Sequence, residues 1–286
     1  MRISMITPTL NRVNYLRECI ESVVKQSHDD VEHVVVDGSS TDGSVELLQS
    51  MSARYGDRIR WISQPDNGIC QAVNRGFQMA TGDVTGWIGS DDRLAEGALV
   101  TVARYFHENP SAQWLYGSYV ILDSRGNFLQ MKKAKPYNYK RFLRTCYICG
   151  PSVFVRTELA HRVSPVCEDL KYMADFEWYL RLAAAAEPHK LDPLLAYLRW
   201  YPGCLSFDRR LDQLDERLRI SLNYVCGTSE RARLTAAIKS RKLRARFGLY
   251  PARLNVRWHL NSFLAHSWAA ARIWLLLSNG QPKRTE

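Results

Sequence analysis

Short apolar runs alternate with amphipathic stretches in the first part of the chain. Four runs rich in Val and Ile are too short for helices, and they predict buried strands at 2–6, 33–36, 59–62 and 84–88. Between them, apolar residues recur at helical spacing, as at Leu16, Ile20 and Val23. Strands that alternate with helices are typical of an α/β fold, so we expect a mostly parallel sheet with right-handed crossovers.

The pattern changes after the fourth of these strands. We expect one helix from 94 to 107 and another from 172 to 186. The strands expected here are 114–122 and 127–131, an antiparallel pair around a polar turn, followed by 152–155 and 194–199. The sheet is therefore expected to be mixed.

Polar loops follow the predicted strands, and two of these loops carry carboxylates. Asp37 ends the second strand, and Asp91 and Asp92 come soon after the fourth. Ligands of open α/β sheets bind beyond the carboxyl ends of the strands, where one or two carboxylates and substrate phosphates suit Mg²⁺ or Mn²⁺. Two interpretations of the Asp-Asp pair stay open from this pattern alone: a metal site, or a cap on the helix expected from about Leu94.

Six stretches carry a more specific signal: ISMITPTLNR, HVVVDGSSTDGS, SQPDNGICQAVNRGFQMATGDV, WIGSDD, GPSVFVRTEL and LKYMADFEWYLRLA. In this order they resemble the family 2 glycosyltransferases of the GT-A type. The resemblance implies a GT-A (Rossmann-like) α/β fold, a mixed and mostly parallel sheet flanked by helices. It also implies a nucleotide-sugar donor that a divalent cation, Mg²⁺ or Mn²⁺, holds over the carboxyl edge of the sheet.

The resemblance assigns several residues to the donor. Asp37 matches the acidic residue that accepts a hydrogen from the base, which suits the N3–H of uracil, although thymine and guanine also offer an N–H. The residues that match the nucleotide pocket are Thr7, Pro8, Thr9, Asn11, Asp66 and Arg75. Arg75 could neutralise phosphate charge, or it could lie on a solvated helix face.

The resemblance also implies the chemistry. Asp91 should face the ribose, and Asp92 should coordinate the metal, which stabilises the charge growing on the departing nucleoside diphosphate. Asp175 matches the general base that takes the proton of the acceptor hydroxyl, in an inverting displacement without a covalent intermediate. The alternative for Asp175 is a surface acid paired with Arg181. Glu177 points to the opposite side of its helix and is expected to serve a supporting role.

The sequence departs from the family at two places. Many members carry a histidine after the last strand that helps to bind the metal, whereas the residues here are Arg199, Trp200 and Tyr201. A water or a phosphate oxygen is then expected in that ligand position. Gly150 stands where a polar residue is common, so the acceptor pocket is not defined by the resemblance.

Composition adds a second, basic part to this picture. The chain has 286 residues, a net charge of +10, 46% hydrophobic and 24% charged residues, which suit one large folded domain with an appendage. The 39 Lys and Arg divide into 27 in residues 1–228, balanced by 27 Asp and Glu, and 12 in residues 229–286, where Glu230 and Glu286 are the acids. Seven cysteines, an odd number, indicate reduced thiols in a cytosolic setting. The Cys146–Cys149 pair lacks the second pair that zinc would need.

The C-terminal part lies outside the resemblance. A basic helix is expected at 231–246 and a second one at 253–277, which carries Trp258, Phe263, Trp268 and Trp274. The uncharged part of the second helix is too short and too polar to span a bilayer. A basic, Trp-rich helix suits an anionic membrane surface, and the alternative is packing on the catalytic domain or on a second subunit in a homodimer. We therefore expect a catalytic domain at 1–210 and a helical extension at 211–286.

These features predict an inverting, metal-dependent glycosyltransferase of the hexosyltransferase type. It would move a sugar from a UDP-linked donor to an acceptor hydroxyl in polysaccharide or glycolipid biosynthesis. We expect it in the cytoplasm, peripheral at the inner face of the cell membrane. A non-catalytic nucleotide-sugar or glycan binding module is the main alternative, but such a module needs no base at Asp175. A nucleic-acid-binding protein is disfavoured, because the chain has no recognised module of that kind.

Overall fold

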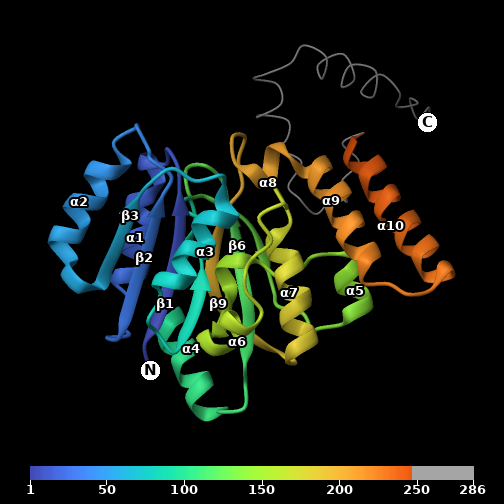
Figure 1. Ribbon diagram of the computed structural model, residues 1–286, viewed down its shortest axis with the longest axis horizontal. Coiled ribbons are helices and arrows are strands. Elements are labelled where there is room, and N and C mark those ends of the chain that lie inside the picture. The colour runs from blue at the N-terminus through green and yellow to red at the C-terminus, as the bar shows by residue number, and fades with distance from the viewer. Residues whose placement is uncertain (247–286) are drawn as a thin grey trace, which may run out of the picture. The chain divides into compact units, whose positions relative to one another are not determined.

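The computed structural model describes residues 1–246, which form a sheet with helices on both faces (Figure 1). Met1–Leu243 form one compact unit, and a second unit begins at Arg244. Within the described residues the sheet has nine strands in the order β3-β2-β1-β4-β8-β6-β9-β5, and β7 pairs with β6. The chain therefore folds as a mixed α/β protein, as the hydrophobic pattern predicted.

The first half is the parallel part of the sheet. Its strands are β1 (Ile3–Thr9), β2 (Val31–Asp37), β3 (Ile59–Ser63) and β4 (Val84–Trp87). The helices between them are α1 (Val13–Val24), α2 (Ser44–Tyr55) and α3 (Ile69–Met79), with the short helix η1 (Gly56–Arg58) before β3. Every residue of β1 and β2 is buried, because helices cover both faces of a parallel sheet. The strands predicted for this half are confirmed.

The second half is mixed. Its strands are β5 (Arg93–Leu94), β6 (Trp114–Leu122), β7 (Phe128–Lys132), β8 (Val153–Arg156) and β9 (Pro188–Arg199). Its helices are α4 (Ala98–Glu108), α5 (Tyr139–Arg144), η2 (Gly150–Ser152), α6 (Thr157–Arg162) and α7 (Ala174–Ala185). The predicted antiparallel pair of β6 and β7 is confirmed, and β9 runs parallel to β6.

The helix expected from 94 begins later. Leu94 belongs to β5 and pairs with Ala196 of β9, and α4 starts at Ala98 after Gly97, whose φ is 71°. The prediction was wrong here because two residues of strand are too few to show a period. One consequence concerns the site: the cap of α4 is Gly97, so neither Asp91 nor Asp92 serves as a helix cap.

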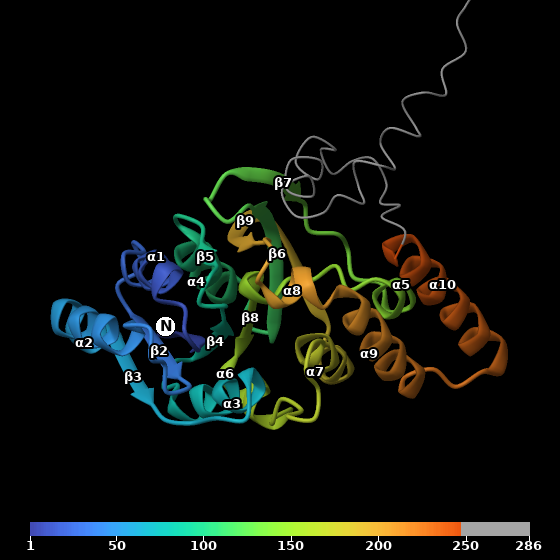
Figure 2. The same ribbon diagram turned by 90° about the horizontal axis from the view of Figure 1, so that it is seen from above.

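The chain continues past β9 in three helices. They are α8 (Leu205–Asp208), α9 (Arg210–Asn223) and α10 (Thr228–Arg246), and α9 and α10 run side by side near α5 and α7 (Figure 2). Ile220 of α9 and Leu234 and Ile238 of α10 are buried in the same hydrophobic cluster as the core of α7. The compact unit thus extends beyond residue 210, where the sequence analysis ended the catalytic domain. The basic helix expected at 231–246 lies within α10, and the Trp-rich helix expected at 253–277 lies outside the described residues.

The register of the parallel strands brings three loops to one edge. β1 lies between β2 and β4, with Thr9 opposite Asp37 and Ile6 opposite Trp87. All three strands run in the same direction, so their carboxyl ends and the loops that follow meet at this edge. The predicted donor residues all lie on β1 or β2, on the loops after β1, β3 and β4, or on α3. No helix of the described residues combines the length and the apolar content that a membrane span requires.

Candidate active site

Asp37 is the last residue of β2, at the carboxyl edge of the parallel strands, and is fully buried. Its Oδ2 accepts the N–H of Ser40 at 2.9 Å and the hydroxyl of Ser63 at 2.7 Å, and its Oδ1 accepts the hydroxyl of Ser40. A carboxylate offers about four acceptor positions. These three hydrogen bonds therefore use both positions of Oδ2 and one of the two on Oδ1.

The loops after β1 and β2 are linked to each other above Asp37. The backbone N–H of Asn11 donates to the Ser40 hydroxyl, and the N–H of Thr41 donates to Oδ1 of Asn11, each at 2.8 Å. Asn11 and Ser39 adopt φ values of 52° and 66°, which are uncommon for residues other than glycine and recur at ligand sites. The Thr9 hydroxyl is buried without a hydrogen-bond partner. The loops thus contain strained backbone and an unsatisfied donor close to Asp37.

Two of the predicted pocket residues offer no free polar group in the structure. Thr7 is buried, and its hydroxyl lies 2.8 Å from Nε2 of His33 inside the sheet. Burial lowers the pKa of His33 to about 3, so this imidazole is neutral and belongs to the core. Pro8 pairs with Val36 in the β1–β2 ladder and has no polar side-chain atom. The structure therefore keeps Asn11 and Thr9, not Thr7 and Pro8, as polar groups at this position.

Asp66 and Arg75 lie on the loop and helix next to Asp37. Asp66 accepts the N–H of Gly68 at 2.8 Å, and its other carboxylate oxygen would lie 2.8 Å from a Cβ at Gly38. Only a glycine at position 38 leaves room for that carboxylate. Arg75 donates from Nη1 to the carbonyl of Pro65 at 2.9 Å, so it fastens the loop that carries Asp66.

The Asp91–Asp92 pair is fixed by the end of β9. Asp92 Oδ1 accepts the backbone N–H of Arg199 at 2.8 Å, and Tyr201 donates its hydroxyl to Asp91 Oδ2 at 2.9 Å. The Arg199 guanidinium donates to the Asp91 carbonyl at 2.9 Å and to Glu18 at 2.8 Å. Burial, and then the charge of Asp91, raises the pKa of Asp92 well above its usual range. A cation between the two carboxylates would relieve that repulsion.

One carboxylate oxygen from each of these two residues approaches the same point beside Gly89. Oδ2 of Asp92 lies 2.9 Å, and Oδ1 of Asp91 3.1 Å, from the point that a Cβ at Gly89 would occupy. The two oxygens therefore converge on a small volume that no side chain fills. Within residues 1–246 no group of three or more His, Cys, Asp or Glu side chains could hold a metal ion. Two carboxylates completed by substrate phosphates are a coordination that Mg²⁺ uses in proteins.

Asp175 begins α7 on the other side of β4. It is partly buried, and burial raises its pKa to about 6, while a hydrogen bond from the Phe176 N–H at 2.7 Å acts in the opposite direction. A carboxylate with this pKa is ionised at neutral pH and binds a proton more readily than an ordinary Asp. Its neighbour in the sequence behaves differently. Glu177 binds Arg181 through both oxygens, the closest pair at 2.8 Å, and accepts the Tyr224 hydroxyl at 2.9 Å.

Arg181 is therefore the partner of Glu177 rather than of Asp175. It also donates to the carbonyls of Val163 and Pro165, so this cluster anchors the middle of α7 to the preceding loop. Asp175 is left without an ion pair to an arginine or lysine among the contacts of the described residues. A free carboxylate at this place is available for proton transfer.

Cys149 connects Asp175 to the Asp-Asp loop. Burial raises the pKa of its thiol well above the usual range, and the charges of Asp92 and then Asp175 act in the same direction. The charges of both carboxylates therefore act on one buried side chain. Next to it, a Cβ at Gly150 would lie 3.0 Å from Nε1 of Trp87 and 3.5 Å from the Tyr179 hydroxyl. The glycine allows η2 to approach Trp87 at the end of β4 and Tyr179 in the middle of α7.

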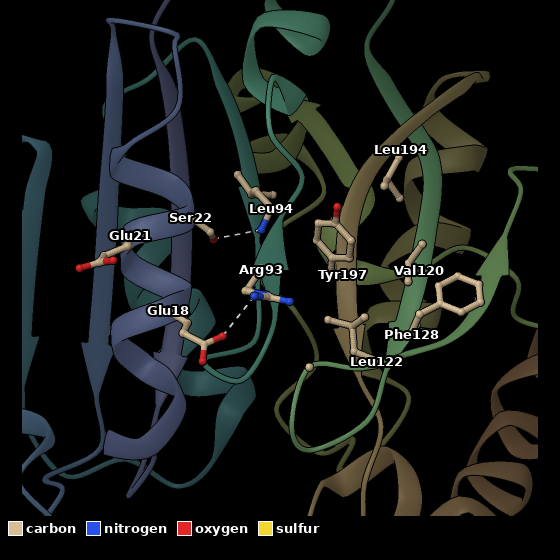
Figure 3. A pocket seen from close by; sticks show the side chains of 11 residues that line it. Glu18, Glu21, Ser22, Arg93, Leu94, Val120, Leu122, Phe128, Leu194 and Tyr197 are labelled. Carbon is tan, nitrogen blue, oxygen red and sulfur yellow. Dashed lines mark hydrogen bonds and ion pairs between the residues drawn. The ribbon is translucent and has the colours of Figure 1, made fainter. Parts of the chain in front are cut away.

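A groove of about 730 Å³ opens beside this edge, between α1 and the strands β6, β7 and β9 (Figure 3). Glu18 and Arg93 line one side of it, and Val120, Phe128 and Tyr197 line the other. None of the predicted site residues lines the groove. Its connection to the site is Glu18, which pairs with Arg93 at 3.3 Å and with Arg199 at 2.8 Å.

Solved structures share this architecture. TarS of S. aureus (residues 1–349), in complex with UDP-GlcNAc, matches 87% of this chain and 73% of its own, with a TM-score of 0.62 and 19% identity. The mannosyltransferase PcManGT from Pyrobaculum calidifontis, in complex with GDP-Man and Mn²⁺, matches 96% of this chain and 82% of its own, with a TM-score of 0.62 and 16% identity. The chain has the GT-A fold of the glycosyltransferases, as expected from its sequence.

The sequence comparisons narrow this class to a family. The profile described as "Glycosyl transferase family 2" matches residues 4–160. The chain belongs to glycosyltransferase family 2. A PGL/p-HBAD biosynthesis glycosyltransferase of Mycobacterium bovis is 30% identical over 179 residues, which cover 62% of this chain and 68% of the relative. Chondroitin synthase of Escherichia coli is 26% identical over 210 residues, which cover 73% of this chain and 30% of the relative.

Several residues that build the site were not predicted. Ser63 holds Asp37, and Arg199 and Tyr201 hold the Asp-Asp pair. Arg199 and Tyr201 were visible as a departure from the family's histidine, and that departure was the available signal. Ser63 ends an ordinary strand, and nothing in its sequence context marks it.

Proposed function

We propose that this glycosyltransferase is an inverting, divalent-cation-dependent enzyme that transfers a sugar from a UDP-linked donor to an acceptor hydroxyl. The observation that carries the proposal is that carboxylate oxygens of Asp91 and Asp92 approach the same point beside Gly89, while the charges of Asp92 and Asp175 both act on the buried Cys149. These groups supply the two requirements of the reaction, which are a place for the diphosphate's cation and a base for the acceptor. The names of the related structures, which mention UDP-GlcNAc and GDP-Man with Mn²⁺, support a nucleotide-sugar donor.

The donor would lie along the carboxyl edge from Asp37 to Asp92. The free acceptor position on Asp37 would take the N3–H of uracil, with Asn11, Asp66 and the backbone after β1 around the nucleoside. Asp91 would face the ribose, and Asp91 and Asp92 would hold Mg²⁺ or Mn²⁺. When bound, the cation offsets the negative charge that develops on the departing diphosphate. Arg75 would add positive charge near the phosphates once it leaves the Pro65 carbonyl.

Asp175 would act on the acceptor. An alcohol is a poor nucleophile at neutral pH, so its proton must be removed as the new bond forms. The carboxylate of Asp175 takes that proton while the hydroxyl oxygen attacks the anomeric carbon from the side opposite the leaving group. Inversion follows from this single displacement. The proposed acceptor is a hydroxyl of a polysaccharide or a glycolipid, and the likeness to chondroitin synthase supports a polysaccharide.

Calorimetry with UDP-sugars and GDP-sugars tests the donor and the metal together. Donor binding should require Mn²⁺ or Mg²⁺ in the unmodified protein, and Asp92→Ala should abolish both the metal dependence and turnover. Arg75→Gln serves as the matched variant, because it weakens phosphate binding without removing a metal ligand. Equal donor affinity in Mn²⁺ and in excess chelator would contradict the proposal, and tighter binding of GDP-sugars would contradict the choice of uracil.

A binding module on the same fold is the alternative function. It would explain Asp37 and the Asp-Asp loop but gives no role to the raised pKa of Asp175. Donor binding without transfer or donor hydrolysis, across a panel of acceptors, would favour the binding module.

We also propose that the protein acts in the cytoplasm, peripheral at the inner face of the cell membrane. The support is the concentration of basic residues in 229–286 and the exposed cations of α10, such as Arg233 and Lys239. An anionic surface attracts such clusters within a Debye length. Removal of residues 253–286 should release the protein from anionic vesicles in co-sedimentation at low salt. A full-length protein that stays in solution, and elutes as a dimer that the truncation dissolves, would favour the homodimer instead.

A further inference from the structure

We propose that Glu216 of α9 is a positioning residue for Asp175, because its carboxylate accepts hydrogen bonds from the backbone directly before α7. The inference rests on the proposed function, in which Asp175 is the base. Glu216 lies beyond the part of the chain that resembles the family and beyond the residues matched by the family profile.

Three successive backbone N–H groups converge on this one carboxylate. Lys171 donates to Oε1 at 3.0 Å, and Tyr172 and Met173 donate to Oε2 at 2.7 and 2.8 Å. The Glu216 side chain is only 9% exposed, so these hydrogen bonds to a charged acceptor are poorly accessible to water. Asp175 follows two residues after Met173. The position of its backbone is therefore set by Glu216.

The local sequence does not supply this support. The residue that precedes α7 is Met173, whose side chain cannot accept a hydrogen bond from the first turn in the way that Ser or Asp does. The N–H groups at the start of a helix need partners from elsewhere. Glu216 accepts the N–H of the cap residue Met173 and those of the two residues before it, so it holds the entry to α7 from a helix 43 residues further along the chain.

The carboxylate is itself held in place. Arg219 approaches its Oε1 at 3.6 Å from the next turn of α9. The Ser221 hydroxyl donates to the Leu143 carbonyl at 3.0 Å, and Ile220 is buried in the core. α9 is therefore fixed against α5. The hydrogen bonds of Glu216 in turn hold the backbone before α7 against α9.

Glu216 also acts on Asp175 through its charge. The titratable groups that face Asp175 are Cys70 of α3, Cys146 and Cys149 before η2, Tyr179 of α7 and Glu216 of α9. Burial raises the pKa of each of these cysteines and of Tyr179, so they are neutral at pH 7. The Glu216 carboxylate opposes ionisation of Asp175 and adds to the effect of burial on its pKa. Loss of this charge should lower the pKa of Asp175.

Two variants separate orientation from charge. Glu216→Gln keeps the length of the side chain and removes the charge, and Glu216→Asp keeps the charge but shortens the reach. Asp215→Asn is the matched control, because it makes the same charge change on the neighbouring residue, whose 56% exposed carboxylate pairs with Lys242 instead. The readouts are amide hydrogen exchange at 171–173 and the pH profile of kcat for the full chain.

Wild-type kcat should rise with pH through about 6 as Asp175 loses its proton. Glu216→Gln should speed exchange at 171–173 by at least about tenfold, lower plateau kcat about tenfold, and move the acid limb to lower pH. Glu216→Asp should speed exchange and lower kcat, but the acid limb of its pH profile should stay at nearly the same pH. Asp215→Asn should change none of the three. A merely structural role would lower kcat without moving the limb of Glu216→Gln.

The outcomes distinguish this inference from the proposed function. Unchanged exchange at 171–173 in both Glu216 variants, or an unmoved acid limb in Glu216→Gln, overturns the inference even if Asp175→Asn is inactive. An active Asp175→Asn overturns the base assignment. The exchange measurement would still show whether Glu216 protects the N–H groups of residues 171–173. If Glu216→Gln does not fold, exchange and kcat of Glu216→Asp decide the same question.

Discussion

Asp37 and Asp175 are both carboxylates at the ends of regular elements, but the protein gives them opposite surroundings. Asp37 receives hydrogen bonds from two serine hydroxyls and a backbone N–H. Asp175 receives the N–H of Phe176, while burial and the charge of Glu216 raise its pKa. Donors aimed at a carboxylate stabilise its charge, and burial without them increases its affinity for a proton. The first environment suits binding, and the second suits proton transfer.

The two environments also differ in how the chain builds them. Ser40 lies three residues after Asp37, and Ser63 ends the adjacent strand β3. The groups around Asp175 come from α3, from the segment before η2 and from α9. The surroundings of Asp37 therefore depend on one strand pair and its loop, whereas those of Asp175 depend on the packing of elements from both halves of the chain.

The largest expected effect removes the proton acceptor. Asp175→Asn keeps the shape of the side chain and should lower kcat by about 10²- to 10⁴-fold, the usual contribution of general base catalysis, with donor affinity nearly unchanged. Steady-state kinetics and donor calorimetry measure the two quantities. Glu177→Gln is the control on the same helix, since it disturbs the Arg181 contact and should cost much less. Near-normal turnover of Asp175→Asn would show that this carboxylate is not the base.

The second effect should fall on binding. Asp37→Asn replaces one acceptor oxygen by an amide that cannot accept the Ser40 N–H or a base N–H, so donor affinity should fall by about 10- to 100-fold, the value of a hydrogen bond to a charged group. The kcat at saturating donor should change much less than in Asp175→Asn. Calorimetry with a UDP-sugar and Mn²⁺ provides the measurement. A large loss of kcat with intact affinity would reverse the roles assigned to the two residues.

The smallest expected effect is on the free energy of unfolding, and it should have opposite signs in Asp175→Asn and Asp37→Asn. The folded pKa of Asp175 is about 6, above an ordinary value of about 4, so its contribution to stability is complete below about pH 4 and is lost as the pH rises through 6. At pH 8, Asp175→Asn should therefore be more stable than the wild type by about 1–2 kcal/mol, after allowance for partial exposure. Asp37→Asn should be less stable at every pH, because it leaves a buried donor unsatisfied. Denaturant unfolding at pH 4 and pH 8 tests both, and equal shifts for the two variants would contradict the comparison.

The sequence predicted those parts of the molecule that depend on near neighbours. The parallel strands, the β6–β7 pair and the position of Asp91 and Asp92 at a strand's carboxyl end follow from local patterns. The strand β5 was missed, because its two residues are strand only through their pairing with β9. For the same reason β9 begins earlier than expected, at Pro188, where it joins β6.

The site was predictable to a similar extent. Motif resemblance assigned roles to the carboxylates, and these roles stay predictions. It did not show that the Thr7 hydroxyl lies in the core against His33, because alternation along a fully buried strand does not reveal this. Arg199, Tyr201 and Glu216 act on residues that are 40 to 110 positions away. Glu216 is one of several acids on a polar helix, and only the folded chain shows which of them meets α7.

Gly89 constrains what this loop can tolerate. A methyl group at position 89 would stand within 3.1 Å of both Asp91 Oδ1 and Asp92 Oδ2, at the point on which these oxygens converge. The methyl group of an alanine at position 89 would occupy the space where the proposed cation would bind, while every charge of the loop stays unchanged. Any larger side chain at position 89 would fill this space more completely. The proposed metal site would thus depend on the absence of a side chain at Gly89 as well as on the two carboxylates.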